Sequence, residues 1–352
     1  WLVGQADSIG EVGLKGRAFY GIGSCYTVMW ETETALIWLD SAANCFSIAG
    51  DSVRLYNTLN SQGVNYSYLG YPRLALASYL KALAYFKRTG SEEKVARLTN
   101  NIGRIYHDQE NPDLANKYYR EAYEMGMKVE DPMVVSSALL NIGMVYLDVD
   151  SLELGEEYMQ KGYDYNRENE VFFMHAVLCN AFAELKIGQG NLDGVIALLE
   201  ESEEMEAAGG GLQARVGRHW VYALYYNARG NTSAAVRAYD SVVTIAKREH
   251  LLEFWMQGES KLYQYHEEIG ETRKALDHYK QFIVLRDSLH DMERASQVEE
   301  LAAIHENEKK QQQIAQLELD KELQEKWLRR QNWLIAGLGI ALVATLILLV
   351  FV

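Results

Sequence analysis

The chain has 352 residues, of which 48% are hydrophobic and 24% are charged, so it can bury an extended core and shows no broad disorder. Its 49 acidic residues outnumber its 34 lysines and arginines and give a formal charge of −15 at pH 7. This charge disfavours nucleic-acid binding, because phosphate contacts need clustered Lys and Arg, whereas a basic or peptide-like partner is tolerated better.

The chain opens with WLVGQADSIGEVGLKG, which contains neither an initiator Met nor a signal peptide. In the repeat register of the following residues, positions 1 to about 9 align with the tail of a second helix. We therefore predict that residues 1–15 are the remnant of a preceding repeat.

Residues 16–288 carry a pattern with a period of 40 residues. Small and large residues alternate at fixed offsets, and the pattern is loosest around residue 190. Seven such units fill this part of the chain. The three clearest sets are Gly103, Tyr106, Ala115, Tyr119 and Ala122; Gly63, Tyr66, Ala75, Tyr79 and Ala82; and Ala223, Tyr226, Ala235, Tyr239 and Val242.

Within each unit the apolar residues recur at helical spacing, and no alternating β-branched run competes. Each unit is therefore predicted to form two helices, and the fold class to be all-α. Pro72, Pro112 and Pro132 are expected in the first turn of a helix, where a proline needs no N–H. The predicted breaks between the two helices lie at Gly70, Asn111, Ser151, Gly190, Gly230 and Gly270.

This spacing resembles the tetratricopeptide repeat (TPR), whose motif also places a small residue, Tyr, Ala, an aromatic residue and Ala at fixed offsets. The resemblance implies an α-solenoid of about seven helical hairpins, although the period of 40 exceeds the usual 34. In such repeats Ala or Gly lets two helix backbones approach closely, and the aromatic side chain fills the wedge between hairpins. HEAT and armadillo solenoids share the period and are the alternative, which the Gly-Tyr-Ala-Tyr-Ala spacing disfavours.

Residues 289–332 contain no Pro or Gly and are rich in Glu, Gln, Lys and Leu, which predicts one long connector helix. Its apolar seam is thin, so a coiled coil that would form a homodimer and a single charged helix both stay open. Residues 333–352, WLIAGLGIALVATLILLVFV, carry no charge and are long enough to cross a bilayer. We predict a transmembrane helix there.

A repeat array followed by such a connector and span resembles the input region of bacterial single-pass membrane sensors, through Asp287 to Leu289 and Arg329 to Trp333. In that group the chain continues into a histidine kinase core or a helix-turn-helix DNA-binding domain. The resemblance implies a bacterial inner-membrane protein with periplasmic repeats. The basic residues Lys326, Arg329 and Arg330 just before the span favour cytoplasmic repeats instead.

In TPR proteins the first helix of each unit lines the concave face that binds peptides, and the resemblance implies the same role here. An asparagine amide donates and accepts at once, so a row of them can bracket an extended peptide. Purely local hydrogen bonds are the alternative, and Ser61 and Ala181 interrupt the row. The predicted peptide-binding residues are Asn100, Asn101, Arg104, His107, Leu140, Asn141, Met144, Asn180, Glu184, Trp220, Leu224 and Asn227.

No catalytic residue, metal site or cofactor is predicted. The pairs His266-Glu267 and His305-Glu306 lack a second His four residues after the first. Gly209–Gly211 has no following Lys-Ser/Thr, which indicates a flexible loop rather than a phosphate cradle. The three cysteines have no metal-ligand spacing, and the eight histidines are expected to be structural or exposed.

The sequence thus predicts a membrane-anchored domain that binds a protein or peptide and forms the input part of a signal-transduction protein. Its further partner would be the lipid bilayer, through residues 333–352, and an output domain such as a kinase would follow residue 352. The alternative is a tail-anchored scaffold that assembles complexes at a membrane without signalling, for which the chain would end close to Val352.

Overall fold

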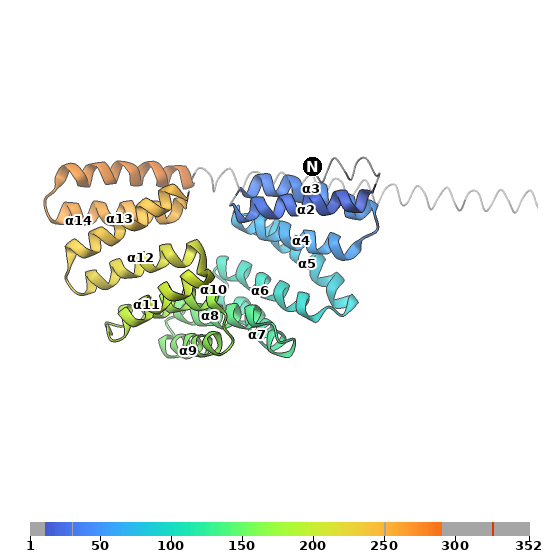
Figure 1. Cartoon of the computed structure of the whole chain (residues 1–352), viewed down its shortest axis with the longest axis horizontal. Coiled ribbons are helices and arrows are strands. Elements are labelled where there is room, and N and C mark those ends of the chain that lie inside the picture. Colours follow the sequence, from blue (N-terminus) through green and yellow to red (C-terminus); the bar gives the residue numbers. More distant parts are fainter. Residues whose placement is uncertain (1–10, 30, 250, 291–325, 327–352) are drawn as a thin grey trace, which may run out of the picture. The chain divides into compact units, whose positions relative to one another are not determined.

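The computed structural model describes residues 11–29, 31–249, 251–290 and 326, and within these ranges the chain forms helices joined by short turns, with no strand (Figure 1). The all-α prediction is therefore confirmed. The helices are α2 (Val12–Val28), α3 (Thr32–Ile48), α4 (Ser52–Tyr68), α5 (Pro72–Thr89), α6 (Glu92–Asp108), α7 (Pro112–Lys128), α8 (Pro132–Asp148), α9 (Leu152–Glu168), α10 (Phe172–Gly188), α11 (Val195–Met205), η1 (Glu206–Gly210), α12 (Gly211–Ala228), α13 (Thr232–Arg248), α14 (Leu252–Glu268) and a last helix over residues 272–290.

Successive helices pair as hairpins, in which α2, α4, α6, α8, α10, α12 and α14 are the first helices. From α3 to α13, each second helix packs against the first helix of the next hairpin. From α2 to α12 each first helix also contacts the first helix of the next hairpin. The first helices are thus consecutive neighbours, so residues 40 positions apart occupy equivalent places on adjacent helices.

In the first four hairpins the two helices approach closely because a glycine of the first helix meets a large side chain of the second helix 16 positions later. A Cβ atom built on Gly103 would lie 2.7 Å from Cδ1 of Tyr119, closer than real Cβ atoms come to other atoms. On Gly63 it would lie 2.5 Å from Cε1 of Tyr79. Both tyrosine side chains are fully buried. The close approach that the TPR resemblance implied is therefore present in these hairpins.

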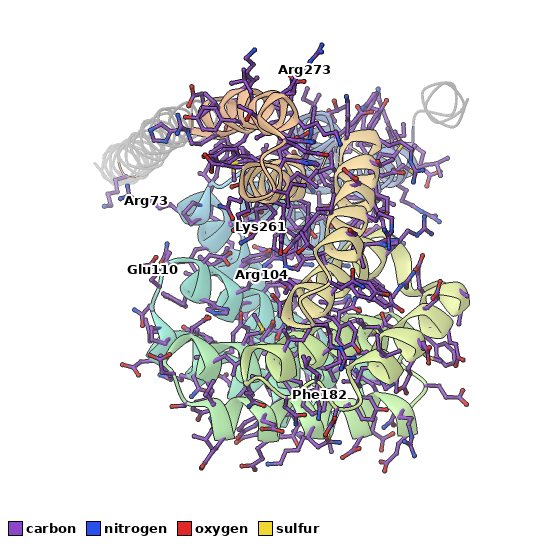
Figure 2. All side chains as sticks on the ribbon, turned by 90° about the vertical axis from the view of Figure 1, so that its left-hand side faces the viewer. Arg73, Arg104, Glu110, Phe182, Lys261 and Arg273 are labelled. Atoms are coloured by element: carbon purple, nitrogen blue, oxygen red, sulfur yellow. The ribbon has the colours of Figure 1, made fainter. Side chains whose placement is uncertain are left out.

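Most helices end in a turn that contains one residue with left-handed backbone conformation. These residues recur at intervals of 20 or 40 positions, so the turns are alike. Glycine adopts that conformation at little cost, whereas a side chain there costs about 1–2 kcal/mol. Four acidic residues nevertheless occupy it, of which Glu110 is labelled in Figure 2. The recurring positions are Gly50, Gly70, Gly90, Glu110, Glu130, Asp150, Glu170, Gly190, Gly230 and Gly270, with φ between 55° and 78°.

Helix starts also follow the sequence pattern. The three prolines lie in the first turn of α5, α7 and α8, as predicted. Asn111 follows the left-handed Glu110 and caps α7 by accepting a hydrogen bond from the N–H of Leu114. Asp131 caps α8 and also pairs with Arg97 of α6 at 2.8 Å, which ties two neighbouring first helices together.

The hairpin of α10 and α11 departs from the regular plan. Its second helix has 11 residues, against 17 in α10, and begins only after Gly194, which has φ 74°. The loop predicted at Gly209–Gly211 is wrong, because Glu206–Gly210 form a π-helical segment and Gly211 begins α12. The buried guanidinium of Arg218 holds this segment through an ion pair with Glu206 at 2.6 Å.

Within the described residues, no helix has the length and apolar character needed to cross a bilayer. The predicted transmembrane helix over 333–352 lies outside those residues. So does the connector over 289–332, apart from residues 289, 290 and 326, and so do residues 1–10 of the predicted repeat remnant.

The Gly103–Tyr119 contact generates the first testable prediction. Replacing Gly103 by Ala places a methyl group against the Tyr119 ring, so we expect the free energy of unfolding to fall by about 1–3 kcal/mol from overpacking. Urea denaturation followed by circular dichroism measures the loss. The control is Gly21→Ala in α2, where no atom lies within 4 Å of the new Cβ; it should raise stability by up to about 1 kcal/mol through helix propensity. Equal effects of the two substitutions would contradict the close-packing account.

Candidate functional site

The structure places the predicted peptide-binding residues on four consecutive first helices. Four lie on α6, three on α8, two on α10 and three on α12. All except Asn180 are exposed or half-buried. We call the surface formed by these eleven residues the first-helix face: Asn100, Asn101, Arg104, His107, Leu140, Asn141, Met144, Glu184, Trp220, Leu224 and Asn227.

Two asparagines of this face each hydrogen-bond to an asparagine on the preceding first helix. The Nδ2 of Asn101 donates to Oδ1 of Asn60 on α4 at 3.3 Å. The Nδ2 of Asn141 donates to Oδ1 of Asn100 at 3.5 Å, a longer and weaker bond. Both pairs are 41 residues apart, a spacing that would have identified Asn60 from the sequence. Each amide has further donor and acceptor capacity, so these bonds position the row without exhausting it.

Arg104 links α6 to α4 at the same face. Its Nη2 donates to Oγ of Ser67 at 3.0 Å, and its guanidinium lies 5.4 Å from the ring centroid of Tyr68 (Arg104 is labelled in Figure 2). The surrounding protein limits hydration of the Asp108 carboxylate and raises its pKa, while the nearby charges of Arg104 and His107 act in the opposite direction.

His107 extends the polar region to the next hairpin. Its Nε2 lies 2.6 Å from Oδ2 of Asp148 at the end of α8. Together with Arg104 and the asparagines, this pair makes the part of the first-helix face on α6 and the neighbouring part of α8 polar and rich in hydrogen-bonding groups. We call this region the polar end of the face.

The other end of the face, over α8, α10 and α12, is mainly apolar. Met144 is 37% exposed, and Leu140, Trp220 and Leu224 are half-buried. Glu184 lies at the repeat position between Met144 and Leu224 and is exposed. Limited hydration nevertheless raises the pKa of its carboxyl, and a hydrogen bond from Trp220 partly offsets this effect. The apolar end therefore contains a carboxylate that a positively charged ligand group would stabilise.

Asn180 does not lie on the face predicted for it. Its side chain is 6% exposed, and its Nδ2 donates to the backbone oxygen of Ala214 on α12 at 2.8 Å. The amide thus joins α10 to α12, at the irregular hairpin where π-helical residues lead into α12. The repeat register does not reveal this change, because it assumes that every hairpin has the same geometry.

Sequence reasoning also missed contacts between histidines and carboxylates. His266 and His278, expected only to be structural or exposed, stack with ring centroids 5.2 Å apart, and the Nδ1 of His278 lies 2.7 Å from Oε2 of Glu259. These residues come from α14 and the last helix. No short motif could reveal them, because the turn between the two helices brings them together.

We expect the Glu184 carboxyl to titrate above the ordinary value of 4.5, because its surroundings oppose ionisation. Trp220→Phe should raise the pKa further, since it removes the hydrogen bond that stabilises the carboxylate. Carboxyl-carbon NMR, assigned with Glu184→Gln, measures both values, and titration of Glu184 at or below 4.5 would refute the assignment.

The same shift predicts a pH-dependent stability. As pH rises, the unfolded state loses this proton first, so this group lowers folding stability once the pH exceeds the ordinary pKa. Glu184→Gln should therefore raise the melting temperature at pH 7 and leave it nearly unchanged below pH 4.5.

Comparison with known proteins identifies the repeats. Residues 54–128 match the tetratricopeptide repeat family. No curated protein matches the sequence. A Rap conjugation gene regulator of the plasmid pLS20 in complex with the Phr* peptide has a similar structure, with a TM-score of 0.66, 14% identity, and coverage of 82% of this chain and 77% of that one.

Two further solved structures are similar. A Rap protein complexed with competence and sporulation factor gives a TM-score of 0.64 at 12% identity and covers 79% of this chain and 77% of its own. The apo quorum sensor NprR from B. thuringiensis gives 0.63 at 13% identity, with coverages of 81% and 80%. At these identities the likeness concerns the fold alone. Residues 54–128 are therefore tetratricopeptide repeats, and the helical solenoid is similar in fold to the Rap and NprR structures.

Proposed function

We propose that the chain binds a peptide, or an extended segment of a protein, along the first-helix face. The observation that carries the proposal is the continuity of the polar and apolar ends over four first helices that contact one another in order. Amides at the polar end suit the backbone of an extended ligand. Met144 and Leu224 at the apolar end offer apolar surface to bury, and Glu184 favours a positively charged ligand group.

The similar folds support this proposal. One of the Rap proteins is complexed with competence and sporulation factor, and the other is in complex with the Phr* peptide. A stacked-helix fold of the same kind here would offer a peptide the same type of surface. No catalytic role is proposed for the described residues.

The binding proposal predicts a position-dependent effect of alanine substitutions. Peptides selected from a random display library would be measured for affinity by fluorescence anisotropy. Met144→Ala and Asn141→Ala should each weaken binding about tenfold, the loss expected for a contact worth about 1.4 kcal/mol.

Matched controls come from the second helices. Met127 of α7 is 47% exposed, and Asn169 follows α9, where its side chain bonds to the backbone oxygen of Tyr165. Met127→Ala and Asn169→Ala should leave affinity unchanged. Selected peptides whose binding responds to the control pair and not to the first-helix pair would place the ligand elsewhere.

We further propose that the domain is the membrane-anchored input part of a bacterial signalling protein, with its repeats in the periplasm. The uncharged residues 333–352 supply the anchor, and the charged connector before them would carry a binding signal to it. A homodimer through the connector would be one way to transmit that signal. The anchor is inferred from the length and apolar sequence of these residues.

Cys25 provides a test of this topology, because it is an exposed free thiol while Cys45 and Cys179 are buried. In intact cells we expect a membrane-impermeant maleimide to label the chain, and Cys25→Ser to abolish the labelling. Removing residues 333–352 should release the protein from the membrane fraction. Labelling only after cell lysis would place the repeats in the cytoplasm, and retention of the truncated chain on membranes would refute the anchor.

A further inference from the structure

A cluster of three metal-ligating side chain types lies inside the irregular hairpin. His175 and Cys179 stand one helical turn apart on α10, and Glu201 faces them from α11. One nitrogen, one sulfur and one carboxylate oxygen from these residues all lie within 4.8 Å of one another. Nitrogen, thiolate sulfur and carboxylate oxygen are the ligand atoms of protein zinc sites.

The other repeats show that packing alone does not require His or Cys at these positions. Forty residues earlier the equivalent side chains are Val135 and Leu139, which are fully or almost fully buried. His175 and Cys179 are just as buried, with exposed fractions of 2% and 0%. Two neighbouring core positions thus carry His and Cys in this hairpin, where the preceding hairpin carries aliphatic side chains. The carboxylate of Glu201, a third kind of metal ligand, faces them.

Only one of the two ring nitrogens of the buried His175 side chain has a hydrogen-bond partner. Its Nε2 lies 2.8 Å from Oε1 of Glu201, whose Oε2 accepts a hydrogen bond from the hydroxyl of Tyr163 at 2.6 Å. The Nδ1 of His175 is buried and has no hydrogen-bond partner. A cation bound by both residues replaces the hydrogen bond between Nε2 and Glu201: the ring proton moves to the unpartnered Nδ1, and the lone pair of Nε2 faces the Glu201 carboxylate.

The charges suit a divalent cation. A thiolate from Cys179 and the carboxylate of Glu201 would together neutralise two positive charges, and His175 would bind as a neutral ligand. Burial raises the pKa of the Cys179 thiol, so the proton stays on sulfur until a cation displaces it. The Glu201 side chain is 27% exposed, which gives an ion a path from solvent. The positive charge of Arg167 also acts on Glu201 and opposes binding.

We propose that His175, Cys179 and Glu201 form a binding site for a thiophilic divalent cation, with zinc as the leading candidate. Tetrahedral zinc with bonds of about 2.0–2.3 Å holds its ligands about 3.5 Å apart. On binding, ligand atoms at the wider separations, up to 4.8 Å, draw closer, whereas Nε2 of His175 and Oε1 of Glu201, now 2.8 Å apart, move slightly apart. Water or the Tyr163 hydroxyl fills the fourth position. The ion fastens the short helix α11 to α10, in the hairpin whose second helix has only 11 residues.

Cobalt substitution tests the site directly. The full chain, purified without a histidine tag or chelator, is titrated with Co²⁺. We expect one ion per chain, a thiolate-to-cobalt charge-transfer band in the near ultraviolet and the intense visible bands of tetrahedral cobalt. Zinc should abolish these bands by displacement and raise the melting temperature of the wild-type chain.

Four variants assign the ligands. Cys179→Ala should remove the charge-transfer band, and His175→Val and Glu201→Gln should each weaken cobalt binding at least about tenfold, the loss that even an outer-shell change produces. Cys45→Ala, which alters a buried cysteine of α3, should retain the complete spectrum.

Circular dichroism checks that each variant folds, and His175→Val restores the residue type of Val95 and Val135 at the same repeat position. Absence of the thiolate band in the wild-type chain at stoichiometric cobalt would overturn the proposal, whatever the variants do. Persistence of the band in a folded Cys179→Ala chain would also overturn it.

Discussion

The contact on which the rest of the structure depends is the one between a glycine of the first helix and the large side chain 16 positions later, which recurs in the first four hairpins. In the pairs Gly63–Tyr79 and Gly103–Tyr119 a single added methyl group would collide with the ring. Because the backbone approaches that closely, the angle and depth of each hairpin are fixed by packing. Hairpins of the same geometry can then stack, with residues 40 positions apart in equivalent places.

Because of this regularity, the residues that stabilise each repeat are different from the residues that line the first-helix face. Many buried positions repeat similar residue types, whereas equivalent positions on the first-helix face vary: Arg104, Met144, Glu184 and Leu224 share one repeat position. A solenoid can therefore change its ligand preference without changing its core. The left-handed acidic residues such as Glu110 show how firmly the plan is set, since packing of the adjoining helices outweighs their backbone strain.

The irregular hairpin concentrates the exceptions. It has the short helix α11, the π-helical segment Glu206–Gly210 and an asparagine, Asn180, that joins two helices instead of lining the face. The His175–Cys179–Glu201 cluster lies in the same place. Local departures from an otherwise consistent pattern often mark functional sites, because residues there serve a function instead of the regular packing. A bound cation would compensate for the contacts that a shorter second helix cannot make.

The sequence by itself determined the helical hairpins and their 40-residue period. The spacing of core residues follows from local helix geometry. Similar small and aromatic residues therefore recur wherever two helix backbones approach each other equally closely. It also located the first helices that carry Asn101, Asn141 and Met144. Only the tertiary structure decided which of these amides bond to each other, that Asn180 is buried, and that His175 meets Glu201. Those outcomes depend on how the helices pack against one another, which a one-dimensional pattern does not encode once a hairpin departs from the common geometry.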